Sequence, residues 1–195
     1  ALNDSEFKDI SIACEYHLEK LISEFPDFKY FFPKNNAGDN TASLILAGQE
    51  SLVTGGLIID SGIVMRKQAV SRMSKEKGKI IAGYELVKNE ANIKTAKLAY
   101  KNGKICLPSE RGSDPIYFSG LIKLSKNSVE SFLSSVEELS LAKKSSLEDI
   151  LVHLINKGEE IDACDISDEW AKIHRPKALS NFIFGTKAET LDRLS

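Results

Sequence analysis

The chain has 195 residues, of which 42% are apolar and 28% charged, and its formal net charge is -2. These values are those of a globular domain with a buried core, and the apolar runs fall far short of the roughly 20 residues that a membrane-spanning helix needs. The three cysteines are odd in number and form no Cys-x-x-Cys pair, which argues against a disulfide framework or a four-thiolate zinc site. We therefore predict a cytoplasmic protein that does not contact a membrane.

The first forty residues predict a helix followed by a loop. Apolar residues from Phe7 to Phe25 recur at helical spacing, and Pro26 ends the pattern. We expect a helix over residues 4–24. The segment 34–40 is rich in Asn, Gly and Asp, and we expect it to be a loop.

From Thr41 onwards the pattern is that of strands. Short apolar runs with β-branched residues are separated by Gly, Ser and Asp, and Asn102-Gly103 is a dipeptide favoured in tight hairpin turns. Residues 68–74 are ambiguous, because their apolar residues also fit the spacing of a short basic helix. We predict a mostly antiparallel sheet between residues 41 and 124. Its expected strands are Ala42 to Ala47, Leu57 to Ile59, Ile63 to Met65, Ile80 to Val87, the two arms of a hairpin from Thr95 to Pro108, and Ile116 to Leu124.

The remaining residues predict helices. Val129 to Val136 and Leu147 to Ile155 each carry an apolar stripe at helical spacing. The predicted fold class is therefore α+β, with an N-terminal helix, a central mostly antiparallel sheet and a C-terminal helical subdomain. We place the division between an α+β core domain, residues 1–125, and the helical subdomain, residues 126–195.

Three predicted helices of this subdomain resemble the layout of a helix-turn-helix module. They span residues 146–157, 167–173 and 176–184, and Ser145 with Glu148 has the spacing of a capping box at the start of the first. A recognition helix needs side chains that reach bases or phosphates, but the neighbouring acidic residues would repel a phosphate backbone. A plain helical bundle is therefore the favoured alternative.

Charge is distributed unevenly along the chain. From Arg66 to Lys104 eleven Lys or Arg stand against three Glu, whereas from Glu137 to Glu169 ten Asp or Glu stand against three Lys. Segregated charge of this kind creates a local field that attracts phosphates. A strand edge protected by lysines, or neutralisation by the protein's own acidic segment, would explain the same pattern. The candidate nucleic-acid-binding residues are Arg66, Lys67, Arg72, Lys75, Lys77, Lys79, Arg175 and Lys177.

No catalytic motif is complete in this sequence. There is no phosphate-binding Gly-x-x-x-x-Gly-Lys-Ser/Thr loop and no dinucleotide fingerprint, so we expect no cofactor. Asp60 and Glu85 loosely suggest the acidic metal site of a nuclease, although Asp60 fits better as a turn residue before Ser61-Gly62. We expect no metal, because two further pairs lack the other members of a metal or catalytic centre: Cys14 with His17, and Cys164 with His174.

Three functions remain open. The sequence favours a non-catalytic, regulatory binding protein that contacts nucleic acid, or a nucleic-acid-handling partner, through its basic segment. The second is a small enzyme with a site assembled from scattered residues, such as Asp60, Glu85 and the loop 109–114. The third is a subunit that docks another protein through the acidic segment 137–169. The sequence does not decide whether the chain is an enzyme.

Overall fold

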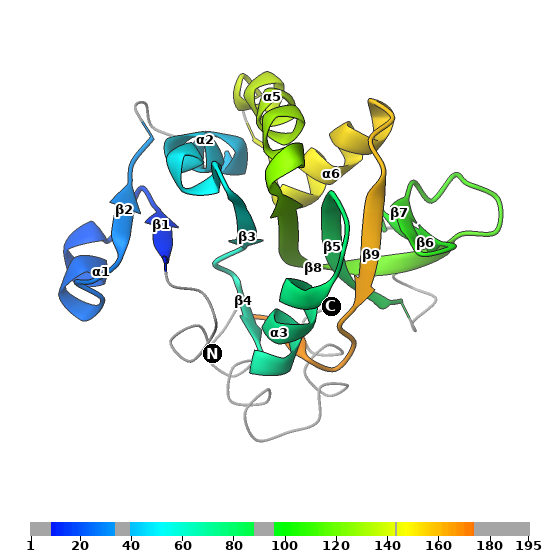
Figure 1. Ribbon diagram of the computed structural model, residues 1–195, viewed down its shortest axis with the longest axis horizontal. Coiled ribbons are helices and arrows are strands. Elements are labelled where there is room, and N and C mark those ends of the chain that lie inside the picture. Colours follow the sequence, from blue (N-terminus) through cyan, green and yellow to red (C-terminus); the bar gives the residue numbers. More distant parts are fainter. Residues whose placement is uncertain (1–8, 34–39, 88–95, 143, 174–195) are drawn as a thin grey trace.

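The computed structural model describes residues 9–33, 40–87, 96–142 and 144–173. It is a mixed α/β fold (Figure 1). In chain order its elements are β1 (Ser11–Ala13), α1 (Leu18–Glu24), β2 (Lys29–Phe31), α2 (Thr41–Ala47), the 3-10 turn η1 (Gln49–Leu52), β3 (Gly55–Ile59), β4 (Ile63–Met65), α3 (Lys67–Lys75), β5 (Ile80–Leu86), β6 (Ala99–Lys101), β7 (Lys104–Cys106), β8 (Asp114–Ser125), the 3-10 turn η2 (Lys126–Ser128), α5 (Val129–Ser140), α6 (Leu147–Asn156), β9 (Ile161–Asp165) and β10 (Trp170–Lys172).

A six-stranded sheet forms the centre of the molecule. Its strand order is β3-β8-β5-β9-β7-β6, and every pairing is antiparallel except the parallel pair β5 and β9. Strand β8 has 12 residues, and its first residues also pair with β6. The pairings among β8, β5, β9, β7 and β6 therefore close into a ring, while β3 stays outside it on the flank of β8.

Helices cover the two faces of this sheet (Figure 1). Helices α2, α5 and α6 lie on one face, and their apolar stripes form the larger core with alternate residues of the strands, among them Ile80, Ala82 and Ile122. Helix α3 lies on the other face, where Ala69 and Met73 pack against the remaining alternate residues. Because β5 is covered on both faces, its residues from Ile80 to Glu85 are all buried.

Two smaller sheets flank the central one. Strands β1 and β2 form a two-stranded parallel sheet, with α1 as the connection between them. Strands β4 and β10 pair antiparallel, so that Trp170 lies opposite Met65. No helix within the described ranges is long and apolar enough to cross a membrane.

Most strands of the predicted sheet are confirmed. β3, β5 and β8 form in the central sheet where the apolar runs predicted them, and the β6–β7 hairpin turns at Asn102 and Gly103, which both have positive φ (50° and 82°). β4 also forms at its predicted position, but it pairs with β10 outside this sheet. The ambiguous segment 68–74 is helical and belongs to α3. The apolar stripes of α5 and α6 are confirmed as well.

The first predicted strand is wrong. Residues Ala42 to Ala47 form helix α2, because Asn40 ahead of them acts as its N-cap and accepts a hydrogen bond from the Ser43 N–H (3.2 Å). A short apolar run does not distinguish a strand from a buried helix, and here the capping residue decides.

Both ends of the chain contain more strand than we predicted. The expected helix over residues 4–24 is confirmed only as α1, and its middle part forms β1; residues before Asp9 lie outside the described ranges. The expected helix at 167–173 is wrong, since β10 lies there, and the expected helix at 176–184 is outside the described ranges. The division at residue 125 stays a prediction, although β9 and β10 pair with β5 and β4 across it.

Candidate active site

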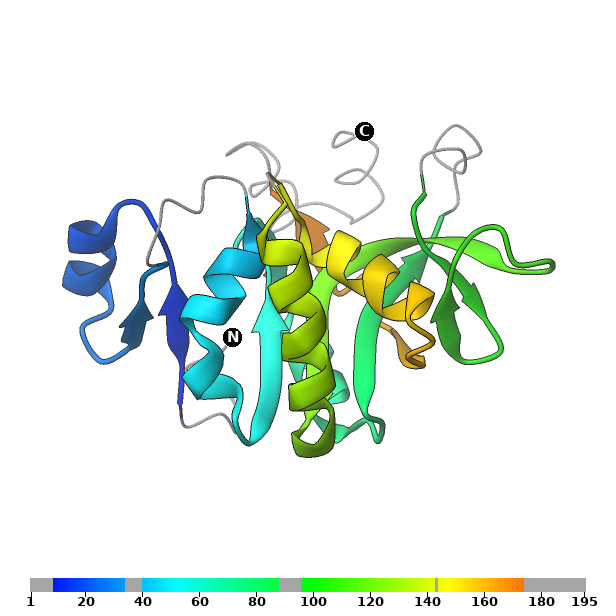
Figure 2. The ribbon, with the colours of Figure 1, turned by 90° about the horizontal axis from the view of Figure 1, so that it is seen from above.

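Three strands of the central sheet end at the same edge. β3 and β5 both run antiparallel to β8 and are therefore parallel to each other, and β9 runs parallel to β5. Their carboxyl ends are at Ile59, Leu86 and Asp165. Helices α2 and α6 begin at this edge as well, as Figure 2 shows from above. Ligands of α/β sheets bind outside the carboxyl ends of the strands, and this carboxyl edge is therefore the candidate site.

Asp60 comes directly after β3 at the carboxyl edge. Its N–H donates to the carbonyl oxygen of Gly120 on β8 (2.9 Å), and its Oδ1 accepts from the N–H of Gly62 (2.8 Å). The predicted turn residue is thus confirmed, and the turn holds a half-buried carboxylate at the edge. Gly120 has φ of +79°, and a Cβ on it would lie 2.9 Å from the Cβ of Asp60. Only glycine leaves this space to Asp60.

The second predicted carboxylate, Glu85, is on β5 and only 2% exposed. It lies opposite Tyr117 of β8, while Asp60 is joined to Gly120 of the same strand. Strand β8 therefore separates the two carboxylates, and the predicted acidic pair does not form. Within the described ranges no three His, Cys, Asp or Glu side chains gather as a metal site.

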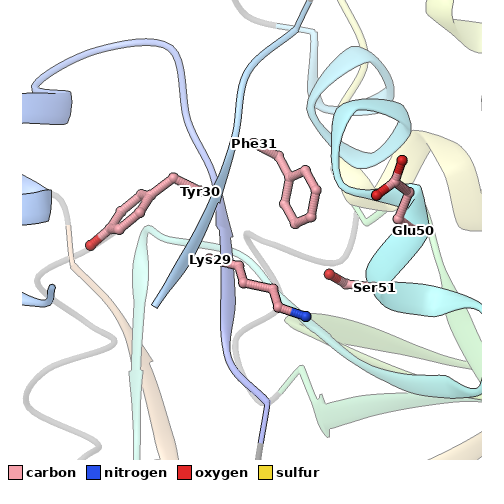
Figure 3. Close-up of a pocket in the computed structure, with 5 residues that line it drawn as sticks. All are labelled: Lys29, Tyr30, Phe31, Glu50 and Ser51. Atoms are coloured by element: carbon pink, nitrogen blue, oxygen red, sulfur yellow. The ribbon is translucent and has the colours of Figure 1, made fainter. Parts of the chain in front are cut away.

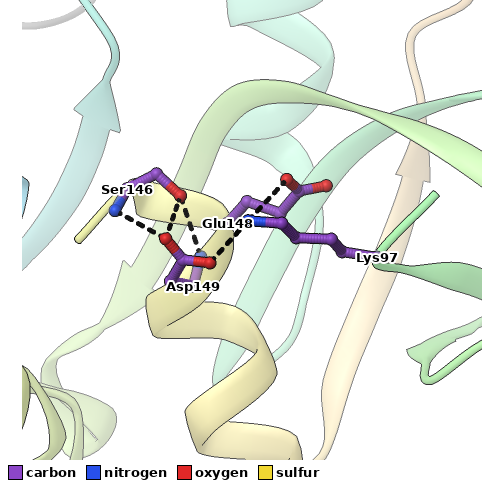
Figure 4. A network of polar contacts seen from close by, with 4 residues as sticks. All are labelled: Lys97, Ser146, Glu148 and Asp149. Carbon is purple, nitrogen blue, oxygen red and sulfur yellow. Dashed lines mark hydrogen bonds and ion pairs between the residues drawn. The ribbon is translucent and has the colours of Figure 1, made fainter. Parts of the chain in front are cut away.

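A charged network occupies the start of α6 (Figure 4). Ser146 and Asp149 form a capping box, one residue later than the predicted Ser145 with Glu148. Lys97 donates to Asp149 Oδ1 (2.7 Å) and lies 4.0 Å from Glu148 Oε2. Burial alone would raise the pKa of Asp149, but hydrogen bonds from Lys97 and Ser146 outweigh it and lower that pKa. Burial raises the pKa of Glu148, although Lys97 opposes this shift.

The sequence alone does not reveal this network, because Lys97 is 52 positions from Asp149 in the chain. A Lys before a hairpin and a carboxylate in the first turn of a helix are both ordinary surface features. Only the fold brings them together at the carboxyl edge. The available signal was the capping spacing, which placed the start of α6 to within one residue.

Replacing Lys97 with Met is expected to destabilise the protein by about 1 kcal/mol at neutral pH. The lowered pKa of Asp149 means that folding favours its ionised form, so this stabilisation is present at neutral pH and is lost as the pH falls through the folded pKa. Glu148 acts in the opposite direction: its raised pKa favours the protonated form, and that contribution is lost as the pH rises. Urea unfolding of both proteins at about pH 7 and about pH 3 checks this. If the two proteins differ by the same unfolding free energy at both pH values, this prediction is wrong.

A buried hydrogen-bonded cluster joins the starts of α2 and α6. Asn40 and Ser145 are each 3% exposed, and Ser145 Oγ donates to Asn40 Oδ1 (2.7 Å). Asn40 Nδ2 donates to the carbonyl oxygens of Ser140 (3.1 Å) and Ala142 (2.6 Å), close to the end of α5. The cluster thus holds three helix ends at the carboxyl edge.

Replacing Asn40 with Ala is expected to cost about 2–3 kcal/mol of unfolding free energy, because it removes the cap of α2 and leaves two carbonyl oxygens without their donor. Chemical denaturation followed by circular dichroism measures this. Asn127→Ala, at an exposed position in η2, is the control and should change stability by less than about 0.5 kcal/mol.

The predicted basic residues that the structure describes lie mainly on α3 and the segment after it. Arg66 is the N-cap of α3, and Lys67, Arg72 and Lys75 are on that helix, which covers the opposite face of the sheet from α6. Arg72 donates to the carbonyl oxygen of Asp165 (2.6 Å) and to Glu169 Oε1 (2.7 Å), so part of the basic segment pairs with the protein's own acidic segment. The remaining candidates lie elsewhere: Lys77 and Lys79 are between α3 and β5, and Arg175 and Lys177 are outside the described ranges.

An open hollow of about 400 Å³ lies beside β2 and η1 (Figure 3). Lys29 and Phe31 extend toward Ser51, whereas Tyr30 points away from it. Because η1 precedes β3, this hollow lies at the amino end of β3 and not at the carboxyl edge. It is therefore separate from the candidate site.

The fold matches solved structures of known enzymes. The "inositol-1-phosphate CTP transferase from T. maritima" matches with a TM-score of 0.61 at 15% identity, covering 82% of this chain and 65% of that one. The "CTP:phosphocholine Cytidylyltransferase from Streptococcus pneumoniae" matches with a TM-score of 0.59 at 14% identity, covering 90% of this chain and 77% of that one. The match thus spans less than two thirds of the first structure. No protein-family model and no curated protein sequence matches the chain.

This likeness overturns the function that the sequence favoured. The chain has the fold of two CTP transferases, and among the described residues Arg72 of the basic segment pairs with Glu169 of the acidic one. A non-catalytic, regulatory nucleic-acid-binding protein is therefore a wrong interpretation. That interpretation depended on the segregated charge, but a run of Lys and Arg in the sequence does not show where the fold places their side chains.

Proposed function

We propose that this protein is a nucleotidyltransferase that joins a cytidylyl group to a small phosphorylated molecule. The observation that carries the proposal is the shared fold, which covers most of this chain. The two solved enzymes take different acceptors, inositol-1-phosphate and phosphocholine by their names. We therefore propose the acceptor class, a phosphomonoester, and not one compound.

The reaction that follows is a single displacement at phosphorus. A phosphate oxygen of the acceptor attacks the α-phosphorus of CTP, the bond from that phosphorus to the bridging oxygen breaks, and pyrophosphate leaves. The attacking phosphate is already an anion at neutral pH, so no side chain has to remove a proton from it. Catalysis of such a step consists of positioning the reactants and stabilising charge.

The residues of the carboxyl edge fit these tasks. Asp60 is held by its turn at the end of β3, and Lys97 supplies a positive charge beside the start of α6. Glu148 is a partly buried carboxylate on the same network, suited to accept hydrogen bonds from hydroxyl groups of an acceptor. We assign charge stabilisation to Lys97 and acceptor binding to Glu148, whereas the anionic Asp60 would act on the phosphates through a bound cation.

Enzymes of this chemistry commonly use Mg²⁺, which is held by one or two carboxylates together with substrate phosphates. Asp60 provides one such carboxylate. When bound, the metal would neutralise charge on the phosphates. Asp60 is the residue that would hold it.

The test is release of pyrophosphate from CTP by the purified protein, with phosphocholine and inositol-1-phosphate as acceptors in separate reactions. We expect release that depends on an acceptor and that is weaker with ATP, GTP and UTP. Calorimetry with CTP alone measures binding apart from turnover. If the protein neither binds CTP nor releases pyrophosphate in the presence of an acceptor, the proposal is rejected.

The cellular location and the partners are also proposals. Cys14, Cys106 and Cys164 are all free, which supports a reducing compartment such as the cytoplasm. We propose small-molecule substrates as the main partners, and a protein partner remains a proposal that the acidic segment supports.

A further inference from the structure

The sheet β1–β2 is unusual in being both small and parallel. Parallel strands occur almost only within larger sheets that are covered on both faces, and two strands alone are marginally stable. Every residue of β1 is half-buried, and α1 has no buried residue. Ile22, Phe25 and Phe32 of this unit are 42–44% exposed. The β1–α1–β2 unit thus carries large apolar side chains, as a buried element would, but these side chains are partly exposed.

Strand β3 is also incompletely buried. It is the last strand of the six-stranded order, and all five of its residues are half-buried, whereas β5 in the middle of the sheet is buried. In both views β1 lies beside β3, and α2 lies over them (Figures 1 and 2). Yet within the described ranges β1 pairs only with β2, and β3 pairs only with β8.

The hydrogen bonds show which backbone groups are left at these edges. Lys29 N–H donates to the carbonyl oxygen of Ile10, and Cys14 N–H donates to that of Phe31, so the even-numbered residues of β1 face β2. Backbone groups alternate in direction along a strand, and those of Ser11 and Ala13 therefore point away from β2.

The backbone groups of β3 alternate in direction in the same way. Asp60 N–H donates to Gly120 on β8, so the even-numbered residues of β3 face β8. The backbone groups of Leu57 and Ile59 consequently point to the open edge. Rows of exposed N–H and C=O groups are the template on which a further strand pairs.

We infer that β1 and β3 together seat one more β-strand, an extended segment that the described residues do not supply. This strand would join the two sheets into one, with apolar side chains toward α2. The inference concerns the sheet alone and is independent of the proposed function.

The test is residue-resolved hydrogen exchange on the 195-residue chain, with a soluble peptide of about six residues as the probe. In this peptide Val alternates with Thr, and Lys closes each end. We expect the N–H groups of Ser11, Ala13, Leu57 and Ile59 to exchange at least about tenfold more slowly with the peptide bound. The inward N–H groups of Ile12 and Ile58 should not change.

Two variants make this test specific. Ala13→Pro removes an edge donor and leaves the hydrogen bonds from β1 to β2 in place, so it should weaken peptide binding and abolish protection of Ser11. Ala13→Val keeps the donor and should behave like the parent chain. Protection that grows with the concentration of the chain alone would assign the edge to a second copy. No change at any peptide concentration, or slow exchange at all four positions without peptide, would overturn the inference.

Discussion

Replacing Asp60 with Asn is expected to lower the rate of cytidylyl transfer by about 10²- to 10³-fold while leaving stability within about 0.5 kcal/mol of the parent protein. Asn has the same shape and keeps an oxygen that accepts the hydrogen bond from the Gly62 N–H, so the turn after β3 should survive. What is lost is the negative charge at the carboxyl edge. Steady-state pyrophosphate release, together with thermal unfolding, separates the two effects.

Asp168→Asn is the matched control for this prediction. Asp168 is also a loop aspartate, but it is exposed and has a positive φ of 63°, a conformation that Asn tolerates well. Its replacement should change neither the rate nor the stability. An Asp60→Asn protein that turns over at the parental rate would remove Asp60 from the active site, even if the protein proves to be a transferase.

Replacing Gly55 with Ala should destabilise the protein by about 3 kcal/mol or more. Gly55 opens β3 with φ of +82°, and a Cβ there would lie 2.5 Å from the carbonyl oxygen of Leu124 and 2.9 Å from the backbone nitrogen of Lys126. Both contacts are with the backbone, which cannot rotate away as a side chain does. Strand β3 would have to move off β8 to accept the methyl group.

Gly103→Ala separates this steric effect from the effect of backbone conformation. Gly103 has the same φ of +82°, but nothing lies within 4 Å of its added Cβ. Its replacement should cost only the strain of the left-handed conformation, about 1 kcal/mol. If urea unfolding shows the same loss of unfolding free energy for both variants, the close approach of the added methyl group to Leu124 and Lys126 contributes nothing.

The parts of the fold that the sequence predicted are those whose signals are local. Asn102-Gly103 defines its hairpin without help from the rest of the chain, and the apolar stripes of α5 and α6 define helices. Strand β9 was missed because it pairs in parallel with β5, 81 residues earlier at Ile81 and Asp162. Its acidic residues Asp162 and Asp165 are three positions apart, so the segment lacks the strict alternation of apolar and polar residues that predicts a strand.

The candidate site was predictable only in fragments. Asp60 was singled out as a carboxylate and as a turn residue, and the structure gives it both roles. Lys97 carried no signal and Glu148 only that of a capping box, because their proximity depends on how β6 and α6 are placed around the sheet. The charge segregation was real in the sequence but, as the Arg72 pair with Glu169 shows, some of it is neutralised internally.

The long strand β8 also governs the order in which the chain can fold during synthesis. β3 and β5 do not pair with each other, and both pair with β8, which is complete only at Ser125. During synthesis the edges of β3 and β5 therefore stay unpaired until about forty further residues after β5 have been added to the chain. The ring closes later still, when β9 enters between β5 and β7. Pairings of such long sequence separation slow folding, and a nascent chain of this protein should depend on chaperones more than its size suggests.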